Sequence, residues 1–283
     1  MTNAAAARDC MAHSQPIVLI TGGSSGIGEA LAYLFAARGH AVVLVARNEA
    51  MLNGIADAIA EKGQPRPLVL PADLTRMDAG ARIAEELVTR GLEPAFVVNN
   101  AGFGLGGDAE SLDHGKQLAM IDLNVRALTE LSLRWTDSIR RHKGGILNVA
   151  SVAGFYPGPG MAVYFATKNY VLSFTEALHH ELAPTGIRVT ALCPGPVKTR
   201  FLERAGLGEA QYPPAFLVSP EEVALQGYNG LMAGQRVVVP GVANKLAGLV
   251  AGLIPHRLTL GAISAQNSRR KAQASPSRTP KAG

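Results

Sequence analysis

Seven short, almost continuously apolar runs alternate with longer segments of helical pattern along most of this 283-residue chain. We predict strands at 16–20, 41–46, 67–70, 95–98, 145–150, 188–192 and 236–239. Strands without polar alternation are typical of sheets covered on both faces, and a strand–helix–strand order forces parallel pairing through right-handed crossovers. The pattern therefore predicts an α/β fold with a doubly wound, parallel, seven-stranded sheet.

Helical patterns fill the gaps between these runs. They cover about 27–39, 48–62, 75–90, 112–141 and 161–184. In the segment 112–141, five apolar side chains are expected on one side of the helix: Ile121, Val125, Leu128, Trp135 and Ile139.

The patterned region contains no internal repeat and no linker, so we expect one domain over 15–242, preceded by a flexible N-terminus at 1–14. A C-terminal helical extension is predicted at 243–265 and a disordered basic tail at 266–283. That tail holds five basic side chains and no acidic one. Removing these five from the 27 basic residues leaves 22, which equals the number of acidic residues. We therefore expect a solvated tail and no nucleic-acid partner; a contact of the tail with RNA or a membrane is the alternative.

Two further features concern the cellular setting. The chain has only two cysteines, Cys10 and Cys193, which excludes a disulfide framework and favours a cytoplasmic protein. Its longest late apolar run, 246–254, is far shorter than the ~20 residues that span a bilayer, so no transmembrane segment is expected.

A glycine-rich turn, TGGSSGIG at 21–28, lies between the first predicted strand and the first predicted helix. Such a junction lets backbone amides approach a pyrophosphate while the positive end of the helix faces its charge. Gly22 would permit the turn, Gly26 the close approach and Gly28 the contact between helix and strand. A plain flexible turn is the alternative, because the spacing differs from the commoner G-x-G-x-x-G.

Tyr164 and Lys168 are four residues apart in the last predicted helix, so their side chains share one face. An unperturbed phenol, with a pKa of ~10, is a poor proton shuttle near neutral pH. A lysine ammonium about 5 Å away, at an effective dielectric of about 20, would favour the phenolate by about 3 kcal/mol and lower the phenol pKa by about 2 units. The pair is a candidate for proton transfer, although the same spacing alone also occurs on ordinary helix surfaces.

These motifs, together with NNAG at 99–102 and Ser151, resemble the short-chain dehydrogenase/reductase family in order and spacing over about 15–240. The resemblance implies a Rossmann-type domain that binds a nicotinamide dinucleotide and transfers hydride to or from a carbonyl carbon. It implies a catalytic set of Asn124, Ser151, Tyr164 and Lys168. In that set Tyr164 exchanges the proton, Ser151 holds the carbonyl oxygen, Lys168 binds the ribose, and Asn124 kinks its helix and anchors a water.

The second strand ends in LVARN at 44–48, where an acidic residue would grip a ribose 2′-hydroxyl. Arg47 stands there instead and could pair with a 2′-phosphate, which favours NADP (NADPH) as cofactor. A polar residue at a strand end is the alternative. Many NADP-dependent relatives carry a second basic residue in the glycine turn, where this chain has Ser24 and Ser25.

The resemblance extends the cofactor site to other positions. Asp73 would contact the adenine amine, or lie in the N-cap region of the next helix, and Val197 would present its amide to the carboxamide. The full predicted set is Gly22, Ser24, Ser25, Gly26, Ile27, Gly28, Arg47, Asp73, Leu74, Asn100, Ala101, Gly102, Tyr164, Lys168, Pro194, Gly195, Val197 and Thr199. No metal is expected, because the histidines lack partners at ligand spacing.

The substrate is expected to be a small, lipophilic ketone or 3-oxoacyl molecule, because apolar residues follow each site motif. They are Phe103, Leu105, Phe155, Tyr156, Phe201, Leu202, Tyr212 and Phe216. The predicted function is NADP(H)-dependent interconversion of a ketone and a secondary alcohol. The alternatives are an NAD-dependent alcohol or hydroxysteroid-type dehydrogenase and a catalytically silent nucleotide-sensing scaffold.

The C-terminal extension lacks the Asp-Gly-Gly turn with which many members end. We predict a helix over 243–263 that buries one apolar face on the substrate cleft as a lid. That face would comprise Val242, Leu246, Leu249, Val250, Leu253 and Ile254. A homodimer through the helices at 112–141 and 161–183 is expected, whereas a tetramer built around the last strand is less well supported.

Overall fold

The computed structural model describes residues 14–199, 201, 205, 212–251 and 260. Within that part of the chain seven parallel strands form one sheet in the order β3-β2-β1-β4-β5-β6-β7. They are β1 (Gln15–Thr21), β2 (Val42–Ala46), β3 (Leu68–Pro71), β4 (Leu92–Asn99), β5 (Gly145–Val149), β6 (Arg188–Leu192) and β7 (Val237–Val238). The strand order reverses between β1 and β4, which confirms the predicted doubly wound sheet and places a crevice at their carboxyl ends.

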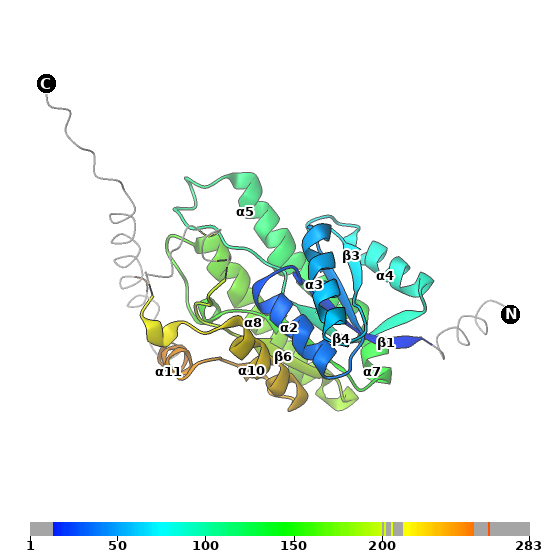
Figure 1. Ribbon diagram of the computed structural model, residues 1–283. Coiled ribbons are helices and arrows are strands. Elements are labelled where there is room, and N and C mark those ends of the chain that lie inside the picture. The colour runs from blue at the N-terminus through cyan, green and yellow to red at the C-terminus, as the bar shows by residue number, and fades with distance from the viewer. Residues whose placement is uncertain (1–13, 200, 202–204, 206–211, 252–259, 261–283) are drawn as a thin grey trace, which may run out of the picture.

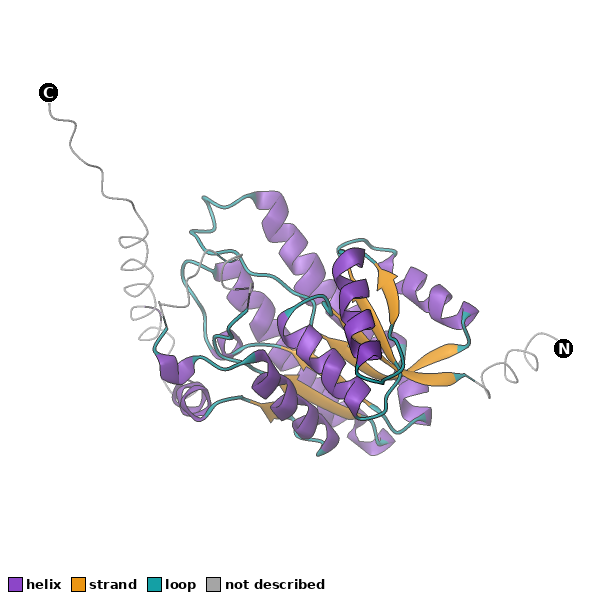
Figure 2. Cartoon of the chain, in the orientation of Figure 1, coloured by secondary structure: helices purple, strands orange, loops and turns teal. Residues whose placement is uncertain are grey.

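Helices cover both faces of the sheet (Figures 1 and 2). On one face lie α2 (Gly26–Ala37), α3 (Glu49–Glu61) and α10 (Pro220–Met232). On the other lie α4 (Ala79–Thr89), α6 (Leu128–Arg134), α7 (Thr136–Arg141) and α8 (Ala162–Leu182). Each layer buries its own apolar cluster against the strands, as the fully buried Phe35 of α2 and Ile139 of α7 show.

The predicted long helix at 112–141 is not continuous. It consists of α5 (His114–Ile121), the π-helical segment η1 (Asp122–Ala127), α6 and α7, with a break at Trp135. Leu128, Trp135 and Ile139 are buried, whereas Ile121 is 41 % exposed. Because the π-helical turn inserts an extra residue, it rotates the side chains before it relative to those after it. A single apolar side over the whole segment was therefore a wrong prediction.

The helix predicted from residue 75 begins at Ala79, with Asp78 at its N-cap position. Asp73 lies before it in a tight turn, where its carboxylate accepts hydrogen bonds from the Thr75 amide at 3.0 Å and the Thr75 hydroxyl at 2.8 Å. The N-cap alternative for Asp73 is thus wrong, because that carboxylate caps a turn at the end of β3.

The C-terminal extension begins with α11 (Val242–Ala251). Val242 is 78 % and Leu246 60 % exposed, whereas Asn244 is 1 % exposed and Gly248 is buried. The predicted burial of Val242 and Leu246 is therefore wrong, because an amide and a glycine form the packed side of α11. The predicted position of this helix at the cleft is borne out for Leu246, which lines it. The structure does not describe the other side chains predicted on that face, which are those of Leu249, Val250, Leu253 and Ile254. The N-terminus at 1–13 and the basic tail also lie outside the described residues.

No helix in the described ranges combines the length and the apolarity needed to cross a bilayer.

Candidate active site

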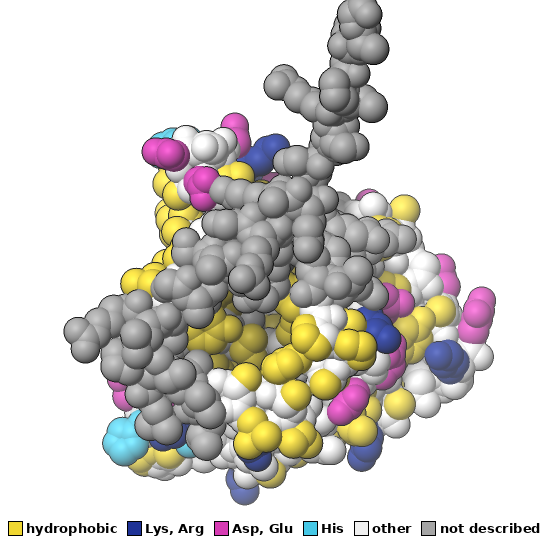
Figure 3. All heavy atoms as spheres, turned by 90° about the vertical axis from the view of Figure 1, so that its left-hand side faces the viewer, with side chains coloured by type: hydrophobic (Ala, Val, Ile, Leu, Met, Phe, Trp, Pro, Cys, Tyr) yellow, Lys and Arg dark blue, Asp and Glu magenta, His cyan; other side chains and the backbone are white. Residues whose placement is uncertain are grey.

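A large cleft of about 1910 Å³ opens at the carboxyl ends of the strands. Its lining includes the glycine turn, the ends of β2 to β5, the start of α8, the loop after β6 and α11. Hydrophobic side chains gather on the same side of the molecule (Figure 3). The volume exceeds the roughly 300–1,000 Å³ of a site for one small ligand, so a dinucleotide and a substrate can lie in it together.

The glycine turn is packed without room for side chains. Gly22 and Gly26 have φ values of +64° and +60°, in the left-handed region that favours glycine. A Cβ on Gly28 would lie 2.3 Å from the Gly22 carbonyl oxygen and 2.4 Å from Nδ2 of Asn100. The turn is also held to the end of β2, since the Gly22 amide donates to the Val45 carbonyl at 2.8 Å.

Asn100 and Thr21 join the glycine turn to the NNAG segment. The Asn100 side-chain amide donates to the carbonyls of Thr21 and Gly22 at 3.0 and 3.1 Å. The Thr21 hydroxyl donates to the Val98 carbonyl and accepts from the amides of Asn100 and Ala101. Sequence reasoning missed Thr21, although its position as the first residue of TGGSSGIG was a usable signal.

The start of α2 is suited to an anion. Ser25 occupies the N-cap position with an extended backbone and makes no side-chain capping bond, so the first-turn amides face the cleft uncapped. Arg47 also lines the cleft, is exposed, and has no salt-bridge partner within the described ranges. These groups fit the pyrophosphate and a 2′-phosphate of a nicotinamide dinucleotide.

Asp73 lines the same part of the cleft. Its hydrogen bond from the Thr75 backbone is the largest cause that holds the pKa of Asp73 below its ordinary value, and the charges of Arg47 and Arg76 act in the same direction. Asp73 is therefore an ionised acceptor at neutral pH, as a contact to an adenine amine requires. The other predicted residues of this end, from Ser24 to Ile27 and from Asn100 to Gly102, line the cleft as well.

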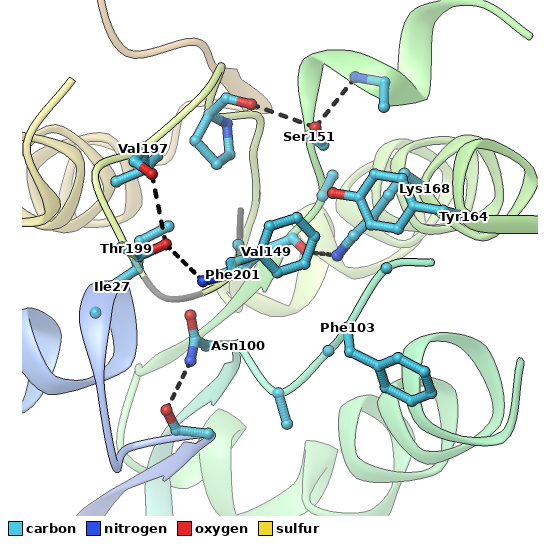
Figure 4. A pocket seen from close by; sticks show the side chains of 18 of the residues that line it. Ile27, Asn100, Phe103, Val149, Ser151, Tyr164, Lys168, Val197, Thr199 and Phe201 are labelled. Carbon is cyan, nitrogen blue, oxygen red and sulfur yellow. Dashed lines mark hydrogen bonds between the residues drawn. The ribbon is translucent and has the colours of Figure 1, made fainter. Parts of the chain in front are cut away.

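Ser151, Tyr164 and Lys168 lie together on one side of the cleft (Figure 4). Ser151 follows β5, and its hydroxyl accepts from the Ala153 amide at 3.1 Å and donates to the Pro194 carbonyl at 3.4 Å. Tyr164 and Lys168 both extend from α8 and are buried. The Lys168 ammonium donates to the Val149 carbonyl at 2.7 Å and lies 5.9 Å from the centre of the Tyr164 ring.

Burial dominates the acid–base properties of this group. It raises the pKa of Tyr164 to about 12, against the smaller lowering effect of the hydrogen bond with Ser151. Burial also lowers the pKa of Lys168 to about 8. The expected lowering of the Tyr164 pKa by Lys168 is thus not produced by the protein's own groups, because both side chains are desolvated and the ammonium is bound to a carbonyl.

Asn124 lies behind this group on η1 and is 1 % exposed. Its side-chain amide exchanges hydrogen bonds with the backbone of Phe103, at 3.0 and 3.1 Å, and donates to the Thr167 hydroxyl at 3.1 Å. Its Oδ1 would lie 2.9 Å from a Cβ on Gly102. Asn124 therefore connects the residue after NNAG to α8, where its partner Thr167 directly precedes Lys168. Asn124 was predicted, whereas no sequence motif indicated Thr167.

The loop after β6 closes the cleft from the opposite side. Val152 donates its amide to Pro194 at 3.0 Å, and Val197 pairs with Val218 through an isolated bridge. A Cβ on Gly26 would lie 2.9 Å from the Thr199 methyl group, so this loop touches the glycine turn. The structure thus brings Gly195, Val197 and Thr199 beside the cofactor residues of the first half of the chain.

Aromatic and sulfur-containing side chains surround Tyr164 on the substrate side. The Phe201 ring lies 5.5 Å from the Tyr164 ring, centre to centre, at an angle of 47°. A Cβ on Gly104 would lie 3.1 Å from both rings and 3.3 Å from the Met161 methyl group. Sequence reasoning missed Gly104, because nothing local marks a residue that packs against a ring sixty positions away. It also missed Met161, although this residue lies only three positions before Tyr164. Leu202 lies outside the described residues.

This fold and this cleft define a Rossmann-type oxidoreductase. A family model described as short chain dehydrogenase matches residues 16–209, and the chain belongs to that family, whose members act on CH–OH and C=O groups with a nicotinamide cofactor. The chain is 35% identical over 196 residues to an uncharacterized oxidoreductase of Staphylococcus epidermidis, covering 69% of this chain and 84% of the relative.

Two solved structures extend the comparison. A short-chain dehydrogenase from Sphingobium yanoikuyae in complex with NADPH is 31% identical, with a TM-score of 0.74 over 95% of this chain and 98% of that one. A 3-ketoacyl-(acyl-carrier-protein) reductase from Brucella melitensis complexed with NADH is 29% identical, with a TM-score of 0.71 over 80% and 96% of the two chains.

In the described ranges of the present chain, no three His, Cys, Asp or Glu side chains are grouped as a metal site would need.

Proposed function

We propose that the protein is an NADP(H)-dependent reductase that interconverts a lipophilic ketone, or a 3-oxoacyl group, and the corresponding secondary alcohol. The observation that carries this proposal is the position of Ser151, Tyr164 and Lys168 at one end of the cleft whose other end holds the glycine turn and Arg47. A carbonyl group beside the tyrosine would then lie next to the reacting end of a bound dinucleotide.

Each side chain has a defined task in this proposal. Ser151 donates a hydrogen bond to the carbonyl oxygen and holds it beside the Tyr164 hydroxyl, whose proton goes to that oxygen during reduction. Lys168 would bind the ribose of the cofactor as an ammonium ion, the form in which it donates to the Val149 carbonyl. Asn124 keeps Lys168 in place through Thr167 and the NNAG segment. The nicotinamide cofactor supplies or accepts the hydride.

Arg47 supports NADP(H) as the cofactor. Its exposed guanidinium at the edge of the cleft can pair with a 2′-phosphate, and a carboxylate that would repel one is absent from the end of β2. The relatives differ on this point, since one structure holds NADPH and another holds NADH. A strict preference for NADH would assign the chain to the alternative, NAD-dependent class.

The walls around Tyr164 support a lipophilic substrate. Phe103, Leu105, Tyr156, Phe165, Phe201 and Phe216 line the cleft at this end. Apolar walls with few polar groups bind apolar ligand surface and leave orientation to Ser151 and Tyr164. The Brucella melitensis relative acts on a 3-ketoacyl group, which has the same reacting carbonyl beside an apolar chain.

The experiment is oxidation of NADPH and of NADH, followed by absorbance, with a panel of small ketones, bulky ketones and 3-oxoacyl thioesters. We expect turnover with NADPH that is fastest for the more apolar substrates. No turnover with any substrate, together with measurable NADPH binding, would support the silent nucleotide-sensing alternative instead.

We also propose a homodimer, on the basis of exposed apolar side chains on α5, α6 and α8. Leu118, Ile121, Leu133 and Tyr170 are 40–49% exposed, and Tyr170 shares a hydrogen bond of 3.0 Å with Thr129 across α6 and α8. Two copies of this surface can cover each other by a two-fold axis. Light scattering of the wild type and of Leu133→Glu should give a dimer and a monomer, respectively.

A further inference from the structure

Asn244 is a buried polar side chain for which the proposed reaction gives no task. It lies on α11, is 1 % exposed, and donates from Nδ2 to the carbonyls of Phe216, at 3.0 Å, and Pro240, at 3.2 Å. These carbonyls belong to separate segments, η5 (Pro214–Phe216) and the loop after β7. One amide therefore connects the start of α11 to a wall of the cleft.

Asn244 is also packed against the loop after β6. A Cβ on Gly195 would lie 2.2 Å from Oδ1, 2.4 Å from Cγ and 2.6 Å from Nδ2 of Asn244. The amide thus fills the space in which any side chain at position 195 would begin, and both residues line the cleft. The absence of a Cβ at Gly195 is therefore required by Asn244.

A second contact holds the same face of α11. A Cβ on Gly248 would lie 3.2 Å from the ring of Phe155, in the short helix η2 (Val152–Phe155) that directly follows Ser151. The packed side of α11, formed by Asn244 and Gly248, consequently touches both the loop after β6 and the segment after Ser151. These two segments form the nicotinamide and carbonyl ends of the proposed site.

We propose that Asn244 is a positioning residue that fixes the loop at Pro194–Thr199, so that α11 is a wall of the reacting end of the cleft. This inference rests on the proposed function for the identity of that end. The amide fills the space beside Gly195 while its Nδ2 holds η5 and the β7 loop at a fixed distance. A leucine of similar size would fill the space but leave two buried carbonyls without their donor.

The first experiment compares Asn244→Leu and Asn244→Ala with Lys245→Ala, a change of the exposed neighbour on the same helix. We expect kcat for ketone reduction to fall about tenfold to a hundredfold in both Asn244 variants, because small displacements at a reacting centre cost that much. The deuterium isotope effect with NADPH labelled at C4 should rise, and the nicotinamide emission of bound NADPH should shift. Binding of 2′,5′-ADP, which carries only the adenosine end, should change less than about twofold, and Lys245→Ala should match the wild type.

The second experiment is a double-mutant cycle with Gly195→Ala. Alone, this substitution adds a methyl group that clashes with the Asn244 amide, and it should lower both Tm and kcat. In the Asn244→Ala background that space is open, so adding Gly195→Ala should then cost little or restore part of the loss. Additive losses of Tm would overturn the inference that Asn244 sets the requirement for glycine.

Other outcomes are equally decisive. Normal kcat and isotope effect with only a lower Tm would mean that Asn244 is structural, and equal weakening of 2′,5′-ADP and NADPH would mean a general loss of the fold. Either result overturns the inference while leaving the proposed function intact. If the wild type reduces no ketone, the proposed function fails instead, and the nicotinamide emission together with the Tm cycle still decides the role of Asn244.

Discussion

The two ends of the cleft are built in different ways. At the adenosine end, the side chains of Asn100 and Thr21 hold the glycine turn and the NNAG segment through hydrogen bonds to backbone groups at distances near 3 Å, within two short contiguous motifs. At the reacting end, Tyr164 packs against residues from segments far apart in the chain, among them Gly104 and Phe201. The first end would therefore present fixed backbone groups to the proposed cofactor, whereas the second can vary its walls without changing the fold.

The largest expected effect lies at the reacting end. Tyr164→Phe removes the proton donor and should lower kcat by about 10²–10⁴-fold, since that is the contribution of a positioned general acid. NADPH binding should stay within about twofold, because the ring remains in place between Phe165 and Phe201. Tyr170→Phe, a change on the exposed side of α8, is the matched control. Substantial turnover in the Tyr164 variant would remove this residue from the mechanism.

Gly28→Ala tests the opposite end. The added methyl group would lie 2.3 Å from the Gly22 oxygen, so we expect a loss of about 1–3 kcal/mol in the free energy of unfolding and weak NADPH binding. Gly54→Ala provides the control on α3, where an added Cβ meets nothing within 4 Å and should stabilise the helix. Chemical denaturation of both variants measures the difference. Equal stability of the two would show that the glycine turn is less tightly packed than described.

Arg47→Asp sharpens the comparison within the adenosine end. Loss of a charge-assisted contact should weaken NADPH binding by about 1.5–3 kcal/mol, or roughly 10- to 150-fold, while NADH binding improves. NADH lacks the 2′-phosphate and is the internal control in fluorescence titrations. An unchanged ratio of the two affinities would show that Arg47 does not select the cofactor.

The pH dependence should reflect Lys168. Because burial lowers the pKa of Lys168 to about 8, its ammonium form predominates below that pH and is lost above it. The proposed contact of Lys168 with the ribose uses the ammonium form, so kcat for ketone reduction should fall by up to about tenfold per unit above pH 8. Lys168→Arg keeps its charge at all accessible pH values and should be less active but without the fall. An identical profile in both proteins would assign the titration to another group.

The smallest effect is expected at the mouth of the cleft. Leu246 lines it while 60 % exposed, so Leu246→Asp should raise KM for long-chain ketones about threefold to tenfold and that for small ketones less. Val242→Asp changes a side chain on α11 that is outside the lining and should affect neither. Equal effects of Leu246→Asp on both substrate sizes would argue against a role of α11 in binding the chain.

The sequence by itself determined the sheet and the candidate site residues, for a physical reason. Apolar runs of strand length that alternate with helical patterns favour a parallel sheet covered on both faces, and β1 to β7 lie within a few residues of their predicted ranges. The glycine turn, NNAG and the Tyr164–Lys168 spacing are likewise local, since each depends on neighbours within eight positions. The glycine turn and the Tyr164–Lys168 pair were therefore candidates from local spacing, whereas the other predicted residues that line the cleft, such as Asp73, Asn100 and Val197, came from the resemblance to the family.

The tertiary structure alone decided what depends on distant neighbours. Burial from several elements raises the pKa of Tyr164 and lowers that of Lys168, which no spacing along α8 encodes. The π-helical segment η1 rotated Ile121 to the surface, and close packing against Gly195 gave α11 a contact face of Asn244 and Gly248 in place of Val242 and Leu246. Periodicity measures apolarity along one helix, whereas the side that is buried depends on how closely another segment approaches it.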